Sequence, residues 1–486
     1  MKSSAIIGGA SVITIIISLV KVKFLAVMLG PDGIGTMGML LTFLTLGSSL
    51  FGLGIGTIGV REIAYHSNDP QKIEQIRIAI FLANLLLGSL GLALITYFSS
   101  ELSIWLFGIP DQEWNIFLLG LGVFISLIYS SQSVVLQGFR KINELARIKI
   151  YSALISAILG LSLVFYFSQD GITGFIILVP ICSCLLSIYY CSLLPKVKHR
   201  YINIKTLIIL WKGMIYLGFI YMLSGFMSEG TKLLTRDIIK NNYSLVDVGY
   251  FQAAWAISMT YITFILGAMA TDYYPRLSSL INNKIKSNEL INDQLEVALT
   301  FSAPVLLVFV SFSPLIISML YTKEFEASIE ILRWQIQGDI LKIAAWPLGF
   351  LILANNKGKM FFSLELLWNL SYILIIYYGL IYFELRVTGY AFFISYILYF
   401  FACKWSAKKI SGFSFNIKNI KILILLFSSS LLITLSSYIS EWIAIIIGSI
   451  CIVISIFYIL KSLKSLDINN GKIKKITLII NKVFSK

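Results

Sequence analysis

The chain has 486 residues, of which 58% are hydrophobic, and its mean hydropathy is +0.86. No water-soluble domain needs this much apolar surface, and many apolar runs are long enough to cross a hydrocarbon layer of about 30 Å. Barrel strands with alternating polarity are absent. The net charge of +15 is explained by basic loops on one side of a membrane, so no nucleic-acid partner is expected.

The apolar segments, taken in chain order, predict about fourteen membrane helices and an all-α polytopic membrane protein. The first segment contains Lys21 and Lys23 and has no convincing cleavage site, so we expect a retained helix rather than a signal peptide. The predicted helices cover 4–29, 35–60, 76–99, 114–138, 145–168, 171–194, 211–236, 246–272, 297–321, 330–354, 359–383, 387–407, 419–439 and 442–461.

The basic residues follow this arrangement. With the N-terminus inside the cell, roughly thirty of the 39 lysines and arginines fall in the predicted cytoplasmic segments. The opposite face holds only Lys240, Lys323 and Arg386. Because cytoplasmic loops are enriched in basic residues, this asymmetry places both termini in the cytoplasm.

A faint internal repeat links two distant helices. Gly35 precedes Arg61 by 26 positions, and Gly249 precedes Arg276 by 27. Six predicted helices separate the two units, so both have the same orientation, as in parallel repeats related by an axis along the membrane normal. We therefore expect two six-helix lobes around a central cavity, followed by two extra helices. The predicted divisions are 1–205, 206–410, 411–462 and a basic cytoplasmic tail at 463–486.

Residues 331–346 form the most informative segment, because they combine charges with a membrane setting. A charge at mid-bilayer costs at least about 3 kcal/mol, so such groups normally face a bundle interior or a wet cavity. On a helix, Gln335, Asp339 and Lys342 share one face. Arg333 and Gln337 form a second row. The stripe predicts a transport pathway; the alternative is a buried Asp–Lys pair that only holds helices together.

Other charges also fall inside or next to predicted membrane helices. Cations outnumber acids, and a cationic cavity suits an anionic substrate, because phosphate oxygens interact strongly with Lys and Arg in a low-dielectric setting. The acids are either counter-charges or sites for a coupling H⁺ or Na⁺. The candidate substrate-binding cations are Lys21, Lys23, Arg61, Lys232, Arg236, Arg333 and Lys342. The candidate ion-coupling or counter-charge residues are Asp339, Glu229, Glu365 and Asp272.

Enzyme motifs are not found, so neither catalysis nor a cofactor is expected. The G-x-G-x-x-G at 54–59 lies inside an apolar helix with no preceding strand, so it favours close packing or bending over nucleotide binding. The five cysteines lie in or at the ends of apolar helices without nearby histidines, which excludes a metal cluster or disulfide framework. Pro304, Pro314 and Pro347 predict kinks.

A family resemblance lies in two stretches, 23–35 and 334–342, together with 137–140 and Glu365. In these residues the chain resembles the Wzx-type O-antigen and polysaccharide flippases. The resemblance covers about residues 4–405. These flippases share a superfamily, MOP, with multidrug-and-toxin (MATE) exporters and lipid II flippases. The resemblance implies a two-lobed bundle with a cationic cavity that opens alternately to each face of the membrane. Lys23, Asp339 and Lys342 occupy matching motif positions.

The resemblance also implies a substrate and a location. Similar proteins move an undecaprenyl-diphosphate-linked oligosaccharide across the bacterial inner membrane, to the periplasmic leaflet, where a polysaccharide polymerase and a chain-length regulator are the expected partners. Two alternatives remain. A drug or metabolite exporter of the same fold predicts a more acidic cavity. A membrane-embedded polymerase predicts a large outer loop, whereas the predicted outer loops are short.

Overall fold

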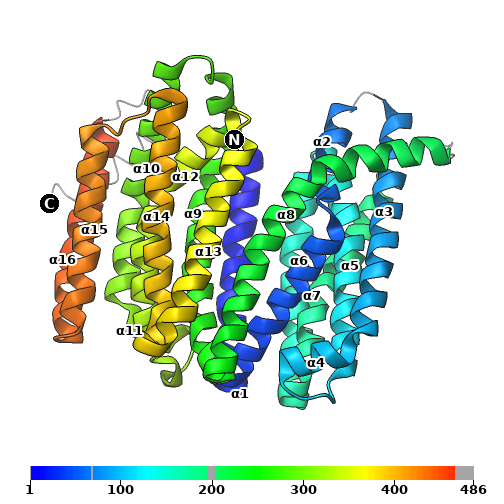
Figure 1. The fold of residues 1–486 in the computed structure, drawn as a ribbon, viewed down its shortest axis with the longest axis horizontal. Coiled ribbons are helices and arrows are strands. Elements are labelled where there is room, and N and C mark those ends of the chain that lie inside the picture. Colours follow the sequence, from blue (N-terminus) through cyan, green and yellow to red (C-terminus); the bar gives the residue numbers. More distant parts are fainter. Residues whose placement is uncertain (1, 67–68, 195–202, 466–486) are drawn as a thin grey trace.

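The computed structural model describes residues 2–66, 69–194 and 203–465, and all the long elements in these ranges are helices. Figure 1 shows two groups of roughly parallel helices that adjoin each other at α1 and α8. The N-terminal group is α1 (Lys2–Gly52), α2 (Ile55–Tyr65), α3 (Pro70–Tyr97), α4 (Ser99–Phe107), α5 (Glu113–Gly138), α6 (Ile142–Phe167) and α7 (Gly171–Ser192). The C-terminal group is α8 (Ile204–Asn242), α9 (Leu245–Ser279), α10 (Lys284–Ser311), α11 (Ser313–Leu320), α12 (Ser328–Ala354), α13 (Gly358–Phe383) and α14 (Val387–Ser411). The last two helices are α15 (Ile417–Ser437) and α16 (Glu441–Ser465).

The helices are long and apolar enough for a multi-pass membrane protein. Within the described residues, nine ranges meet this criterion, or ten if the bent α8 counts as one span. Three of them, Gly9–Gly52, Ile142–Ser192 and Gly358–Ser411, contain 44, 51 and 54 residues, about twice the length of one crossing. The polytopic helical class is therefore confirmed, while the number of fourteen crossings and the division of the chain at 205, 410 and 462 stay predictions.

The predicted first and second helices form one element with a sharp break. Gly30 has φ 62° and ψ −169°, and Pro31 follows it inside α1. Glycine tolerates this backbone region at no steric cost, and proline lacks the N–H that a continuous helix would use. The second helix was predicted at 35–60, with close packing or bending at its glycines. It ends instead at Gly52, because Gly54 is left-handed (φ 67°) before α2 begins.

A second difference lies at the lower end in Figure 1. The helix predicted at 297–321 is divided into α10 and the short α11. Pro314 lies in the first turn of α11, where proline is accommodated, whereas in a continuous helix its ring would clash with the preceding turn.

Helix α12 forms the centre of the C-terminal group and packs against α9, α10, α13, α14 and α15. Ile336, Ile340 and Ala344 are fully buried. One polar row of α12 faces the last two helices. The Arg333 guanidinium donates to both carboxylate oxygens of Glu441 on α16, at 2.8 and 2.6 Å. The amide of Gln337 donates to two hydroxyls of α15, those of Ser430 at 2.8 Å and Thr434 at 3.0 Å. The extra helices therefore cover polar groups that would otherwise face lipid.

The attachment of the last two helices predicts that removing the Glu441 carboxylate lowers the free energy of unfolding more than removing the Glu296 carboxylate does. Glu441→Ala is expected to lower the free energy of unfolding by about 3 kcal/mol, the low end for breaking a buried ion pair, because the Arg333 side chain is 5% exposed while that of Glu441 is 47% exposed. Glu296→Ala is the matched control, since its partner Lys418 is 52% exposed and such pairs contribute below about 1 kcal/mol. Unfolding of both variants in detergent measures the difference. Equal losses of unfolding free energy in the two variants would contradict the view that Glu441 holds a buried Arg333 in place.

Candidate functional site

A cavity of about 570 Å³ lies among α8, α9, α12, α13 and α14. Its α12 residues run from Lys342 to Leu353, so it extends from the middle of that helix toward the end drawn uppermost in Figure 1. Two lysines and one glutamate line it: Lys232, Lys342 and Glu365. Eight further lining side chains are aromatic: Trp255, Trp346, Phe350, Phe361, Trp368, Phe392, Tyr396 and Tyr399.

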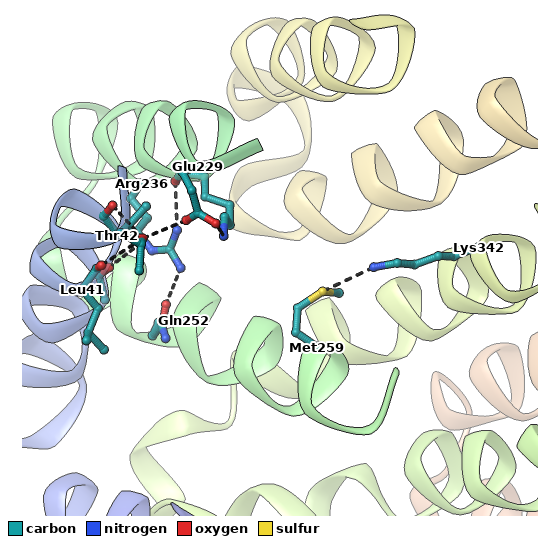
Figure 2. A network of polar contacts seen from close by, with 10 residues as sticks. Leu41, Thr42, Glu229, Arg236, Gln252, Met259 and Lys342 are labelled. Atoms are coloured by element: carbon teal, nitrogen blue, oxygen red, sulfur yellow. Dashed lines mark hydrogen bonds and ion pairs between the residues drawn. The ribbon is translucent and has the colours of Figure 1, made fainter. Parts of the chain in front are cut away.

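Lys342 contributes a charge that its surroundings only partly neutralise. Its Nζ lies 3.4 Å from the Met259 sulfur (Figure 2) and faces the rings of Phe392 and Tyr396, at 5.9 and 5.6 Å from the ring centres. Among the described side chains, no carboxylate lies within 4.0 Å of it. Aromatic faces attract a cation but leave its hydrogens free to donate. Lys342 can therefore receive an anion.

Asp339, one helical turn before Lys342, is fully buried and does not line the cavity. One carboxylate oxygen accepts hydrogen bonds from the hydroxyls of Ser258, at 2.7 Å, and Tyr261 on α9. Its other oxygen has no hydrogen-bond partner in the described part of the chain. No ion pair within 4.0 Å joins Asp339 to Lys342, so the two charges of the stripe have different neighbours.

Lys232 belongs to a polar network that joins three helices. Its ammonium pairs with Glu229 one turn earlier on α8, and the hydroxyl of Thr45 on α1 donates to the same carboxylate at 2.9 Å. Arg236, 2% exposed, donates to the Lys232 carbonyl at 3.0 Å and to the side-chain oxygen of Gln252 on α9. Figure 2 shows this network on the opposite side of Met259 from Lys342. It connects the cavity wall to the N-terminal group.

Glu365 is the carboxylate that lines the cavity itself. The hydroxyl of Tyr399 donates to it at 3.0 Å. With Lys232 and Lys342, it leaves the lining with one net positive charge.

Two candidate cations of α1 lie away from this cavity. The Lys23 ammonium donates to the carbonyl of Ser318, at 2.9 Å, and to that of Tyr321, at the C-terminal end of α11, where a cation complements the helix dipole. Lys21 lies 5.1 Å from the centre of the Phe175 ring on α7.

Two further candidates, Arg61 and Arg333, are also outside the cavity lining. Arg61 on α2 is exposed and lies 3.0 Å from Glu62. Arg333 is held by Glu441. The side chain of Asp272 lies outside those that the structure describes. The structure thus places Lys232, Lys342 and Glu365 around one space, with Asp339, Glu229 and Arg236 behind its walls.

The sequence reasoning missed the aromatic lining and the hydroxyl partners of Asp339. Ser258 and Tyr261 lie one turn apart on the same predicted helix, 246–272, so their hydroxyls share a face, but the spacing does not name the partner.

The helical fold and this charged cavity define a class of polytopic membrane protein with a charged space inside its helix bundle. Among solved structures, an inward closed conformation of the lipid II flippase MurJ matches with a TM-score of 0.72 at 18% identity, covering 94% of this chain and 99% of that one. An inward-facing multidrug resistance MATE family transporter of the MOP superfamily matches with a TM-score of 0.68 at 15% identity, covering 85% and 99%. These likenesses show a shared fold.

The sequence comparisons give the family. The model described as "Polysaccharide biosynthesis protein" matches residues 24–330, and the chain belongs to this family. The lipid III flippases of Escherichia coli (strain K12) and Shigella flexneri are each 24% identical over 373 residues, 75% of this chain and 87% of theirs. The expected kinship with polysaccharide-biosynthesis membrane proteins is confirmed by this family match, and the similar proteins named here are described as flippases and transporters rather than enzymes.

Proposed function

We propose that this protein is a flippase for a lipid-linked oligosaccharide. It moves an undecaprenyl-diphosphate-linked unit, of O-antigen or a similar surface polysaccharide, from the cytoplasmic to the periplasmic leaflet of the bacterial inner membrane by alternating access. The observation that carries the proposal is the ammonium of Lys342, which points into a membrane-embedded cavity with no carboxylate partner among the described side chains. The family match and the lipid III flippase relatives support it.

Each part of such a substrate has a suitable partner in or near the cavity. Phosphate oxygens accept strong charge-assisted hydrogen bonds from ammonium groups, so Lys342 and Lys232 bind the diphosphate. The aromatic side chains offer large flat apolar surfaces against which sugar rings rest. The prenyl chain stays in the lipid bilayer, since its transfer into a charged cavity would expose apolar surface to polar groups.

An ion gradient drives the cycle in this proposal, with H⁺ or Na⁺ bound at Asp339 or Glu365. Both carboxylates lie in the membrane-spanning region, where an ionisable group marks an ion pathway. Asp339 has one oxygen without a hydrogen-bond partner in the described chain, which supports an ion or proton at that position. The polymerase and the chain-length regulator are proposed partners on the periplasmic side, and both termini are cytoplasmic.

A drug or metabolite exporter is the second candidate. The aromatic lining around Glu365 would suit a lipophilic cation, because ring faces attract positive charge. The two lysines in the same lining favour an anion, so the flippase is the better-supported function.

The proposal predicts where a deletion strain accumulates its intermediates. Loss of this protein should leave completed lipid-linked units on the cytoplasmic leaflet and remove the surface polymer. Labelling of lipid-linked sugars with a membrane-impermeant reagent, in intact and lysed spheroplasts, measures the sidedness. Single units that reach the outer face unpolymerised would instead indicate a polymerase. A normal distribution of lipid-linked units between the two leaflets, combined with increased drug sensitivity of the deletion strain, would indicate an exporter.

A further inference from the structure

A second groove, between α2 and α5 of the N-terminal group, has a chemistry different from that of the cavity. It has a volume of about 450 Å³, within the range of roughly 300–1,000 Å³ typical of small-molecule sites. No charged side chain lines it. Its polar lining consists of four hydroxyls and one amide, from Thr57, Tyr129, Ser130, Ser133 and Gln137.

Most of these polar groups are free to bind a ligand. Within the described part of the chain, no hydrogen bond engages the side chains of Thr57, Ser130 or Gln137, while Tyr129 interacts with Ser133. A hydroxyl both donates and accepts, and an amide carries two donors and one acceptor. The groove therefore offers unused donors and acceptors on neutral groups.

The groove occupies a position in α5 that corresponds to the cavity position in α12. Four of the five α5 residues that line it lie eight, five, four and one residues before the end of that helix at Gly138, and four of the five α12 residues that line the cavity lie at the same distances before its own end at Ala354. The two sets are Ser130, Ser133, Val134 and Gln137, and Trp346, Gly349, Phe350 and Leu353. The fifth residues, Tyr129 and Lys342, do not correspond.

This correspondence places both sites on one central pathway. In the internal repeat, α5 is the fourth predicted helix of the first half and α12 the fourth of the second. In parallel repeats around an axis along the membrane normal, equivalent faces are turned toward that axis. Both sites also lie in the halves of their helices that are uppermost in Figure 1. A substrate held by Lys342 in the C-terminal group would therefore have this groove across the axis.

We propose that the α2–α5 groove is a second substrate subsite, which binds the hydroxyl-rich sugars of the lipid-linked substrate that extend beyond the aromatic side chains of the cavity, while the cavity binds its diphosphate. The inference rests on the proposed function. Neutral sugars carry many hydroxyls and no charge, so hydroxyl and amide partners match them, whereas a diphosphate requires the lysines. The groove determines which glycan is accepted; the cavity recognises the diphosphate that all such lipids share.

The test removes the polar groups of the groove while nearly preserving its shape. The triple variant Thr57→Val/Ser130→Ala/Gln137→Leu is compared with wild type for binding of two probes, undecaprenyl diphosphate and undecaprenyl diphosphate carrying a trisaccharide. Intrinsic tryptophan fluorescence reports binding, because three tryptophans line the cavity. A neutral hydrogen bond changes affinity about two- to tenfold. We therefore expect the variant to bind the glycosylated probe at least tenfold more weakly, with affinity for the bare probe changed less than twofold.

A control variant and the wild type separate the other outcomes. Ser126→Ala lies on the same helix outside the groove, where its hydroxyl bonds to the Gly122 carbonyl, and should bind both probes as wild type does. If the triple variant loses affinity for both probes equally, or for neither, or if wild type binds both probes with equal affinity, the subsite is refuted. If wild type binds neither probe, the proposed function fails, and the subsite fails with it.

Discussion

Lys342→Gln is expected to lower the rate of lipid-linked oligosaccharide transport by about ten- to a hundredfold. Hydrogen bonds to a charged group contribute about 1.5–3 kcal/mol, and the described direct contacts of Lys342 Nζ are with the Met259 sulfur and two aromatic rings, with no described carboxylate within 4.0 Å. In the proposed function, its charge is therefore available to bind the diphosphate. Glutamine keeps a polar side chain of similar length but loses the cation. Transport into proteoliposomes, normalised to the amount of folded protein, measures the effect.

Lys418→Gln provides the control for a lysine that does not face the cavity. Lys418 is half exposed and pairs with Glu296, so its loss should leave transport unchanged. Asp339→Asn should also impair transport, since it removes the buried carboxylate while Ser258 and Tyr261 can still donate to the remaining oxygen. Normal transport by both the Lys342 and the Asp339 variants would mean that the polar stripe of α12 is structural.

The two polar rows of α12 show what a sequence pattern can and cannot predict. Helical spacing separates Asp339 and Lys342 from Arg333 and Gln337, and the structure places these pairs against different neighbours. Periodicity defines which residues share a face, but it does not name the helix that packs on that face. The docking of α15 and α16 on the Arg333 row could therefore not be predicted.

The charges of α1 illustrate the same limit. A lysine inside an apolar helix normally faces a bundle interior or a wet cavity, and Lys23 was predicted to be a substrate-binding cation of the cavity. Its partners are backbone carbonyls of Ser318 and Tyr321, about three hundred residues away. Backbone carbonyls have no sequence signature, so reasoning from side chains assigned Lys23 to the cavity, whereas the structure places it against α11.

The faint internal repeat, in contrast, corresponds to a physical contact. The glycines that identified it, Gly35 and Gly249, lie against each other where α1 crosses the start of α9. A Cβ atom on Gly35 would lie 2.0 Å from the carbonyl oxygen of Leu245, and one on Gly249 would lie 1.9 Å from the carbonyl oxygen of Pro31. The contact is reciprocal, because each glycine approaches the residue four positions before the other. It brings the N-terminal and C-terminal groups together at the lower end in Figure 1.

Gly35→Ala and Gly249→Ala should each separate the two groups of helices at this end. The overlap is with backbone atoms, so no change of rotamer relieves it, and we expect a loss of about 3 kcal/mol in the free energy of unfolding, the upper part of the range for overpacking. Spin labels at Ile109 and Met319, both exposed, should report a longer distance in a cysteine-free background. Gly230→Ala is the control, because its Cβ would meet no atom within 4 Å. Wild-type stability and distance in both variants would contradict the prediction. Because the contact closes the end opposite the cavity, weakening it should favour the state open at that end and slow transport even though every charged residue is retained.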